Sequence, residues 1–290
     1  MPDIEPVESD DTGVAIWTVV AVAVAVVSLL SVPAWFLIRE VMTVEIGAPQ
    51  GAASSPDRQG AAATDGTMTI LVDTVLAADH DGDIVIGAHN VMLDCAGHTI
   101  TGPGRLSVRN GINVFQKSGV TVKNCFIEEF NAGFLINQSD DNTFTNNTVS
   151  HVRTGFTLFE SDNNKISRNN VSDATDWFGY GLLDGSDENV LSENTATSVS
   201  GVGFMSWGAN RNSFRDNEAS NNTGNGFGAN DPNTTGNTYI GNIANDNTGR
   251  GIEDNTTGGT GDDVTANTYT GNVCEGNAGG GSHPRNLCSP

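Results

Sequence analysis

A short asparagine-rich motif recurs along the second half of this chain and constrains its fold more than any other feature. The motif reads Asn-x-apolar-x-x-Asn-x-small apolar, and successive copies start 22, 25, 23, 25 and 30 residues apart. Self-similarity at this period is typical of repeat architectures, in which each repeat contacts only its neighbours. The six copies begin at Asn142, Asn164, Asn189, Asn212, Asn237 and Asn267.

A second series, a glycine followed by an apolar residue, runs in phase with the first. Apolar residues alternate within each unit, as Phe134 and Ile136 do, which favours short strands over helices. A unit of about 22 residues accommodates three strands and three turns. The series comprises Gly111-Ile112, Gly133-Phe134, Gly155-Phe156, Gly181-Leu182, Gly203-Phe204, Gly226-Phe227 and Gly251-Ile252.

Stacking such units in register predicts an all-β fold, a single right-handed parallel β-helix of about eight coils spaced roughly 4.8 Å apart. The asparagines can take the left-handed conformation in turns and can pass side-chain hydrogen bonds along the stack. We therefore expect the six motif asparagines and the aromatic residues Phe134, Phe156, Phe204 and Phe227 to form structural ladders.

The chain divides into four predicted parts. Residues 1–13 are acidic without a basic side chain and predict a disordered tail. Residues 14–38 are apolar, with Trp17 and Trp35 near the two ends, as expected of one transmembrane helix. Residues 39–67 are rich in small residues with Pro and Gly and predict a flexible linker. Residues 68–290 form the predicted β-helix with its C-terminal cap.

The charges beside the apolar segment bear on the orientation of this anchor. Arg39 is the only basic residue next to the apolar segment and would place the following domain in the cytoplasm. Long domains, however, cross the membrane largely regardless of charge. We expect a single-pass membrane protein with an extracellular β-helix domain. Six glycosylation sequons permit but do not decide this, at Asn137, Asn146, Asn170, Asn221, Asn233 and Asn255.

The net charge of −22 excludes nucleic acid as a partner, because 13 Lys and Arg residues face 35 Asp and Glu residues. The Asp-rich, Lys-poor composition resembles that of proteins from salt-loving organisms. A repeat protein whose turns favour Asp and Asn is the alternative reading.

The four cysteines fall into two pairs. Cys274 and Cys288 lie in the last, glycine-rich segment, where a disulfide would hold the final coil. Cys95 and Cys125 occupy similar places in successive coils, as a second bridge or as two buried thiols. Bridges would indicate an oxidising exterior.

The first coils carry a family resemblance. Residues 82–102, GDIVIGAHNVMLDCAGHTITG, and residues 119–127, GVTVKNCFI, resemble the right-handed β-helix proteins of the pectate-lyase-like superfamily. The resemblance is greatest to periplasmic β-helix proteins linked to copper delivery for nitrous-oxide reductase, and it covers residues 69–275. It implies the fold more than an activity, because one fold hosts many functions. Lyases of the superfamily hold Ca²⁺ on carboxylates and use a Lys or Arg base, whereas its hydrolases use clustered Asp.

Metal-binding candidates are few. Asp79, Asp81 and Asp83 place three carboxylates within five residues, a spacing suited to Ca²⁺, although the rest of an EF-hand loop is missing. A polar turn is the alternative, and we expect no other cofactor. Asp94 and His98 predict a hydrogen-bonded turn, since a lone His is a poor copper site.

The candidate ligand site is a platform of aromatic residues for sugar rings. Trp177, Tyr180 and Trp207 would supply apolar faces, and Asp176 and Asp184 would accept hydroxyl hydrogens. The alternative is that these aromatic residues cover part of the coil core.

Two functions follow from these features. The first is a membrane-anchored surface protein with a structural, adhesive or recognition role, such as a spike, on a cell or virus envelope. The second is a polysaccharide-binding or polysaccharide-active protein, either a lyase or a hydrolase. No catalytic residue is assigned, and we lean against an enzyme. Expected partners are the membrane, glycans or surface proteins, and a further copy of the chain.

Overall fold

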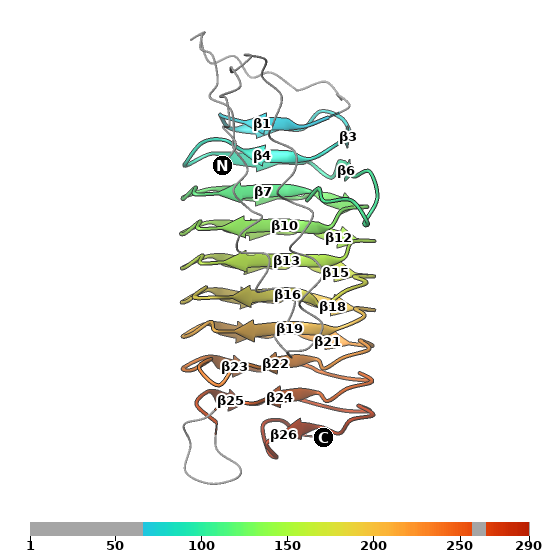
Figure 1. Ribbon diagram of the computed structural model, residues 1–290, viewed down its shortest axis with the longest axis vertical. Helices are drawn as coiled ribbons and strands as arrows, with labels where there is room; N and C mark the ends of the chain where they lie inside the picture. The colour runs from blue at the N-terminus through green and yellow to red at the C-terminus, as the bar shows by residue number, and fades with distance from the viewer. Residues whose placement is uncertain (1–65, 257–264, 290) are drawn as a thin grey trace, which may run out of the picture. The chain divides into compact units, whose positions relative to one another are not determined.

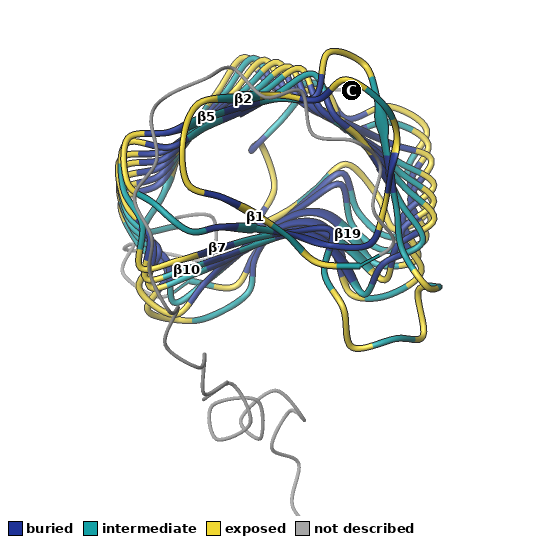
Figure 2. Cartoon of the chain, turned by 90° about the horizontal axis from the view of Figure 1, so that it is seen from above, coloured by how far each residue is buried: buried dark blue, intermediate teal, exposed yellow. Residues whose placement is uncertain are grey.

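The computed structural model describes residues 66–256 and 265–289, which form a right-handed parallel β-solenoid. All 26 named elements in these residues are strands, and every strand pair is parallel (Figure 1). Most coils contribute one strand to each of three sheets, here called A, B and C, whereas the coils of β22 and β24 have only isolated bridges in place of a strand of sheet C (Figure 2). The predicted all-β parallel β-helix is confirmed.

Sheet A has ten strands and forms the indented side of the coil in Figure 2. Its strands are β1 (Met68–Ile70), β4 (Ile84–Ile86), β7 (Ile112–Phe115), β10 (Ala132–Asn137), β13 (Thr154–Phe159), β16 (Phe178–Leu183), β19 (Val202–Trp207), β22 (Phe227–Ala229), β24 (Ile252–Asp254) and β26 (Ser282–His283).

Sheets B and C close the coil with short strands. The nine strands of sheet B are β2 (Thr74–Val75), β5 (Met92–Asp94), β8 (Thr121–Lys123), β11 (Thr143–Thr145), β14 (Lys165–Ser167), β17 (Val190–Ser192), β20 (Ser213–Arg215), β23 (Thr238–Ile240) and β25 (Thr268–Thr270). The seven strands of sheet C are β3 (His80–Asp81), β6 (Thr99–Thr101), β9 (Phe126–Glu128), β12 (Thr148–Ser150), β15 (Asn170–Ser172), β18 (Thr195–Thr197) and β21 (Glu218–Ser220).

Aromatic rings stack along the interior behind sheet A. The ring centroids of Phe134, Phe156, Tyr180, Phe204 and Phe227 follow one another at 4.3, 5.1, 4.6 and 4.9 Å. All five side chains are buried, and each adds hydrophobic burial of roughly 1.5–3 kcal/mol to the core. The predicted ladder of Phe134, Phe156, Phe204 and Phe227 is confirmed.

The predicted place of Gly181-Leu182 in this series is wrong. Tyr180, not Leu182, pairs with Phe156, and Gly181 pairs with Thr157. The segment Gly179-Tyr180-Gly181-Leu182 contains two glycine–apolar pairs, and the structure uses the first. The interior therefore receives Tyr180, whose hydroxyl donates to the carbonyl oxygen of Asn169 at 2.9 Å.

The motif asparagines form a buried hydrogen-bonded ladder, as predicted. The backbone N–H groups of Asn142, Asn164, Asn189, Asn212 and Asn237 each donate to the side-chain oxygen of the next motif asparagine at 2.7–3.0 Å. The ladder residues do not take the left-handed conformation. In five of the six copies the preceding residue does so instead, for example Asn163 (φ 58°) and Glu188 (φ 59°). The left-handed residue turns the chain and the following asparagine enters the interior.

Two further asparagine ladders run in parallel with the first. Asn147, Asn169, Asn194, Asn217 and Asn242 repeat the same backbone-to-side-chain hydrogen bond at 2.9–3.0 Å. A shorter third ladder joins Asn222, Asn247 and Asn277 at 3.0 and 2.9 Å. It was not predicted, because its early rungs are not asparagines.

Two disulfides join coils near the two ends of the solenoid. Cys274–Cys288 is present as predicted, and Cys95–Cys125 resolves the alternative in favour of a bridge. The four cysteines thus leave no free thiol.

The predicted tail, transmembrane helix and most of the linker lie outside the described residues. Within residues 66–256 and 265–289, no helix is long and apolar enough to cross a membrane.

Candidate functional site

The outer face of sheet A carries two columns of side chains that point away from the coil interior. Toward the C-terminal ends of the strands, residues point alternately inward and outward, and the parallel register stacks each outward residue on its equivalents in neighbouring coils. The column at the C-terminal ends of the strands contains Phe115, Asn137, Phe159, Leu183 and Trp207. The middle column contains Asn113, Leu135, Thr157, Gly181, Met205, Gly228 and Glu253.

Over β13, β16 and β19 this outer face becomes apolar. Phe178, Leu183 and Met205 are buried there and form a cluster separate from the coil interior. The partly buried side chains of Phe159, Val202 and Trp207 pack against it. We call these six residues the outer-face cluster. Phe159, Val202 and Trp207 keep part of their apolar surface exposed on the outside of the coil, where it adds nothing to the interior core and is available to an external partner.

The cluster depends on a close contact within β16. A Cβ atom built on Gly181 would lie 2.4 Å from Cε2 of Phe178, so the Phe178 ring occupies the space above Gly181. The glycine allows the ring to lie flat against the sheet.

Polar residues border the cluster toward the N-terminal coils. The hydroxyls of Thr154 and Thr157 lie 3.1 Å apart, and Asn110 Nδ2 donates to Asn113 Oδ1 at 3.0 Å. Small polar groups beside an apolar surface are the combination that ligand sites use to orient a bound molecule.

The predicted platform residues Asp176 and Trp177 lie at the edge where sheet C leads into sheet A. Trp177 is 43 % exposed immediately before β16. The carboxylate of Asp176 accepts a hydrogen bond from Nε of Arg153 at 3.1 Å. The carboxylate of Asp176 is therefore held in an ion pair with Arg153, and a ligand would have to share it.

Asp184 and Trp207 lie at the opposite edge, where sheet A leads into sheet B. Leu183 pairs with Trp207, and the N–H of Asp184 donates to the carbonyl oxygen of Trp207 at 2.9 Å. Trp177 precedes Leu183 by six residues, which is roughly 20 Å along a strand. The two tryptophans therefore flank one outer face instead of forming a single platform.

Tyr180 is not part of this surface. Its side chain is fully buried in the aromatic stack, and burial raises the pKa of its hydroxyl well above the usual value. The structure thus places the predicted platform residues around the outer-face cluster, with Tyr180 beneath it.

Carboxylates stack along the corner between sheets A and B. The N–H groups of Asp162 and Asp187 donate to the side chains of Asp140 and Asp162 at 2.8 and 2.7 Å. Burial raises the pKa of Asp162, the hydrogen bond from Asp187 opposes this, and the charges of Asp140, Asp187 and Glu188 raise it further. The net pKa lies above 3.8.

Two of the three carboxylates considered for Ca²⁺ are directed to other partners. Asp79 accepts a hydrogen bond from the N–H of Thr99 at 2.9 Å, and Asp83 forms an ion pair with Arg109 at 3.1 Å. In the parts of the chain that the structure describes, no three His, Cys, Asp or Glu side chains are grouped to hold a metal ion.

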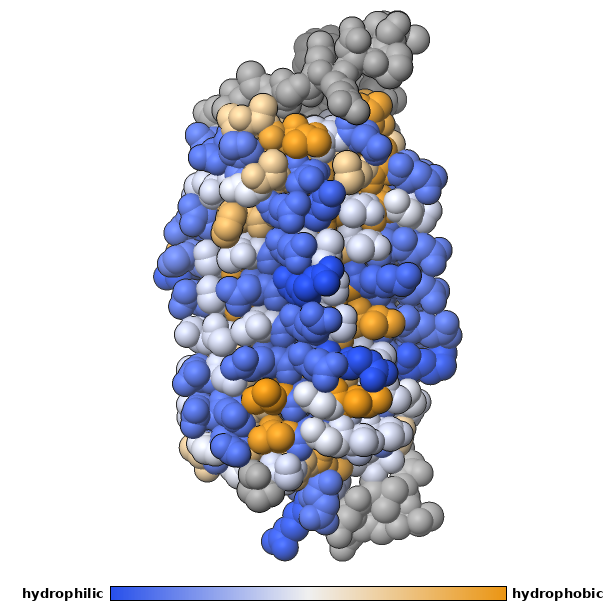
Figure 3. All heavy atoms as spheres, turned by 180° about the vertical axis from the view of Figure 1, so that it is seen from behind, coloured by the Kyte–Doolittle hydropathy of each residue, from blue (hydrophilic) through white to orange (hydrophobic). Residues whose placement is uncertain are grey.

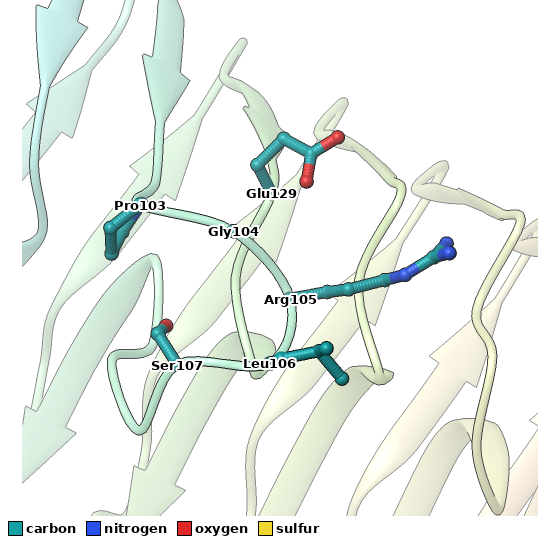
Figure 4. Close-up of a pocket in the computed structure, with 6 residues that line it drawn as sticks. All are labelled: Pro103, Gly104, Arg105, Leu106, Ser107 and Glu129. Carbon is teal, nitrogen blue, oxygen red and sulfur yellow. The ribbon is translucent and has the colours of Figure 1, made fainter.

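A shallow hollow of about 330 Å³ lies beside the loop between β6 and β7. Its side chains do not converge, since Arg105 and Glu129 point in different directions (Figure 4). It offers a ligand less than the outer-face cluster does. The hollow is lined by Pro103, Gly104, Arg105, Leu106, Ser107 and Glu129.

The side of the solenoid away from sheet A is mainly hydrophilic (Figure 3). Apolar side chains on that view are in small, separate groups between long runs of hydrophilic residues.

Comparison with known families gives one match to this domain. The family model described as periplasmic copper-binding protein (NosD) matches residues 89–283, more than half of the chain. The chain belongs to the NosD family. Comparison of this NosD-family chain with curated protein sequences found no match.

Solved structures with similar folds are enzymes of polysaccharide chemistry. The periplasmic alginate epimerase AlgG has a TM-score of 0.53 and 15% identity, over 66% of this chain and 51% of the epimerase. This NosD-family chain therefore spans about half the length of the epimerase. An alginate lyase from a Paenibacillus species has a TM-score of 0.40, 13% identity and coverage of 75% and 98%. A catalytic domain of an alpha-1,3-glucanase has a TM-score of 0.36, 12% identity and coverage of 77% and 61%. At such identities the likeness shows the fold alone.

The donor set in the described residues of this NosD-family chain does not fit copper. Copper sites use His, Cys and Met ligands, but all four cysteines are in disulfides. His98 contacts Asp79 at 3.2 Å and His89 contacts Ser118 at 3.1 Å, so each ring already has a separate partner. Because the described residues contain no group of three His, Cys, Asp or Glu side chains placed to hold a metal ion, we derive no copper chemistry for this chain.

The sequence alone did not reveal Phe159, Phe178, Leu183 and Met205 as a cluster. A signal was present in β19, where the outward positions 202, 205 and 207 are all apolar. To find the cluster from the sequence, one must know the register between the strands of sheet A. The two glycines of β16, Gly179 and Gly181, made that register ambiguous.

Proposed function

We propose that this chain is a membrane-tethered recognition protein that acts outside the cytoplasm and binds a glycan on the outer face of sheet A. The observation that carries the proposal is the outer-face cluster itself. Six apolar side chains that contribute nothing to the coil interior are gathered over three adjacent strands.

Aromatic and aliphatic surfaces bind sugars by covering the apolar faces of pyranose rings, with nearby polar groups fixing the orientation. Trp207 and Phe159 supply the rings, and Thr154 and Thr157 supply hydroxyls beside them. The relation of the fold to that of an alginate epimerase supports a glycan as the ligand class.

Two observations support a position outside the cytoplasm. All four cysteines are in disulfides, which persist in oxidising compartments. The family is described as periplasmic. The tether rests on residues 14–38, whose length and apolar composition suit a membrane-spanning helix.

Binding to a glycan array by the full-length chain tests this function. Trp207→Ala should weaken binding at least about tenfold, or about 1.4 kcal/mol, because it removes a ring from the cluster. Phe126→Ala is the matched control, since Phe126 is a 47 % exposed aromatic residue on sheet C, away from the site. Equal losses in the two variants, or binding to no glycan, would contradict the proposal.

A further inference from the structure

The outer-face cluster has no ionisable side chain of its own. Its six members are apolar, and the polar residues beside it, Thr154 and Thr157, are uncharged. A carboxylate brought against this surface would lose its water without gaining a cation, which is unfavourable. The floor of the proposed site therefore suits uncharged chemical groups.

Arg153, at the edge between sheets C and A, already has partners among the described residues. Arg153 donates to Asp176 through Nε at 3.1 Å and to Asn131 Oδ1 through a terminal nitrogen at 3.3 Å. Its charge is compensated by Asp176, so an anionic ligand would have to compete with a side chain already in place.

The edge between sheets A and B carries excess negative charge. Asp140, Asp162 and Asp187 stack in successive coils, and Glu188 lies beside Asp187. Arg211 contacts both Asp187, at 3.1 Å, and Glu188, at 2.9 Å. Arg211 thus pairs with two of these four carboxylates.

These carboxylates lie close enough to the outer-face cluster for their negative electrostatic potential to act on a ligand bound there. Asp162 follows Phe159 by three residues, and Asp187 follows Leu183 by four. Such separations along a turning chain fall within about one Debye length at physiological salt, so screening is incomplete. A chain of uronic acids bearing one carboxylate per ring would be repelled along this whole edge.

We propose that the ligand is an uncharged glycan and that the carboxylate edge excludes acidic polysaccharides. This inference rests on the proposed function and adds its substrate class. The solved relative of the same fold is named for alginate, an acidic polymer, whereas the charge on this face favours neutral sugars.

The test compares neutral oligosaccharides with uronic acids of the same backbone on one array, using the full-length chain. A suitable pair is the β-1,4-linked mannose hexamer and the hexamer of mannuronic acid, which differ only at C6. We expect binding to neutral members alone, lost in Trp207→Ala and unchanged between low and high salt. Binding to acidic members that depends on Trp207 would overturn the neutral class and leave the recognition function intact. Binding to none would overturn both.

A charge variant tests the cause. In Asp162→Asn/Asp187→Asn, the side-chain oxygens can still accept the backbone hydrogen bonds, because Asn210 does the same in the next coil, accepting from Thr235 N–H at 2.8 Å. We expect affinity for acidic oligosaccharides to rise at least about threefold and affinity for neutral ones to stay unchanged. An unchanged preference in a folded double variant would contradict the role of this edge.

Discussion

The buried side-chain oxygen Oδ1 of Asn189 accepts two hydrogen bonds from Asn164, one from the backbone N–H at 2.8 Å and one from the side-chain Nδ2 at 3.1 Å. Asn189 Nδ2 in turn donates to the carbonyl oxygen of Ser161 at 2.9 Å. One side chain therefore satisfies several polar groups of the turn in the preceding coil.

Asn189→Ala should be strongly destabilising. It leaves the Asn164 N–H and the Ser161 carbonyl without these partners, and each buried group left unpaired costs about 1–3 kcal/mol. Urea unfolding followed by circular dichroism measures the loss. Asn170→Ala, at an exposed position on β15, is the control and should change stability by less than about 0.5 kcal/mol. Similar losses in both variants would show that the ladder is not structural.

Phe156→Ala should cost about 3–5 kcal/mol in the free energy of unfolding, because it opens a cavity in the aromatic stack between Phe134 and Tyr180. Phe156→Asp should prevent folding, since it buries an unpaired charge. The control is Phe126→Ala on the exterior. A folded Phe156→Asp variant with a normal unfolding midpoint would contradict the placement of this ring.

Gly181→Ala should disturb the outer-face cluster while keeping the solenoid. The added methyl group would meet the Phe178 ring, and overpacking of this kind costs about 1–3 kcal/mol. We expect a changed tryptophan emission spectrum and weaker glycan binding. Gly228→Ala is the matched control in the same column, because its nearest neighbour is the flexible side chain of Asn230 at 3.1 Å. If the tryptophan emission spectrum changed in Gly228→Ala and not in Gly181→Ala, the assigned contact between Gly181 and Phe178 would be contradicted.

Asp162→Asn should raise stability at neutral pH. Burial and then the neighbouring carboxylates hold the pKa of Asp162 above 3.8 in the folded state, despite the hydrogen bond from Asp187. The folded state thus binds this proton more tightly than the unfolded state, and the stability it contributes below pH 3.8 is lost as pH rises through the raised pKa. The Tm of the variant should exceed that of the natural chain at pH 7 and converge with it below pH 3.8. A lower Tm at pH 7 would reverse the assigned sign.

Interior positions could be predicted from the sequence because each demands the same chemistry in every coil. Asn142 and its copies must satisfy the same backbone groups, and Phe134 and its copies fill the same space, so the residue type repeats. Tyr180 was misplaced because Gly179 and Gly181 both fit the pattern, and the choice between them depends on the length of the preceding turn. The outer-face cluster could not be predicted in the same way. Leu135, Thr157, Gly181 and Met205 share one column but point away from the coil interior, where no common constraint makes them alike.

The in-register ladders make the single coil the unit by which this protein can change its length. Excision of residues 212–236 would bring Asn237 to the position that Asn212 now holds against Asn189, with the same amide chemistry across the new junction. Because Phe159, Phe178 and Trp207 all precede the excised segment, the rod would shorten while its recognition face survived.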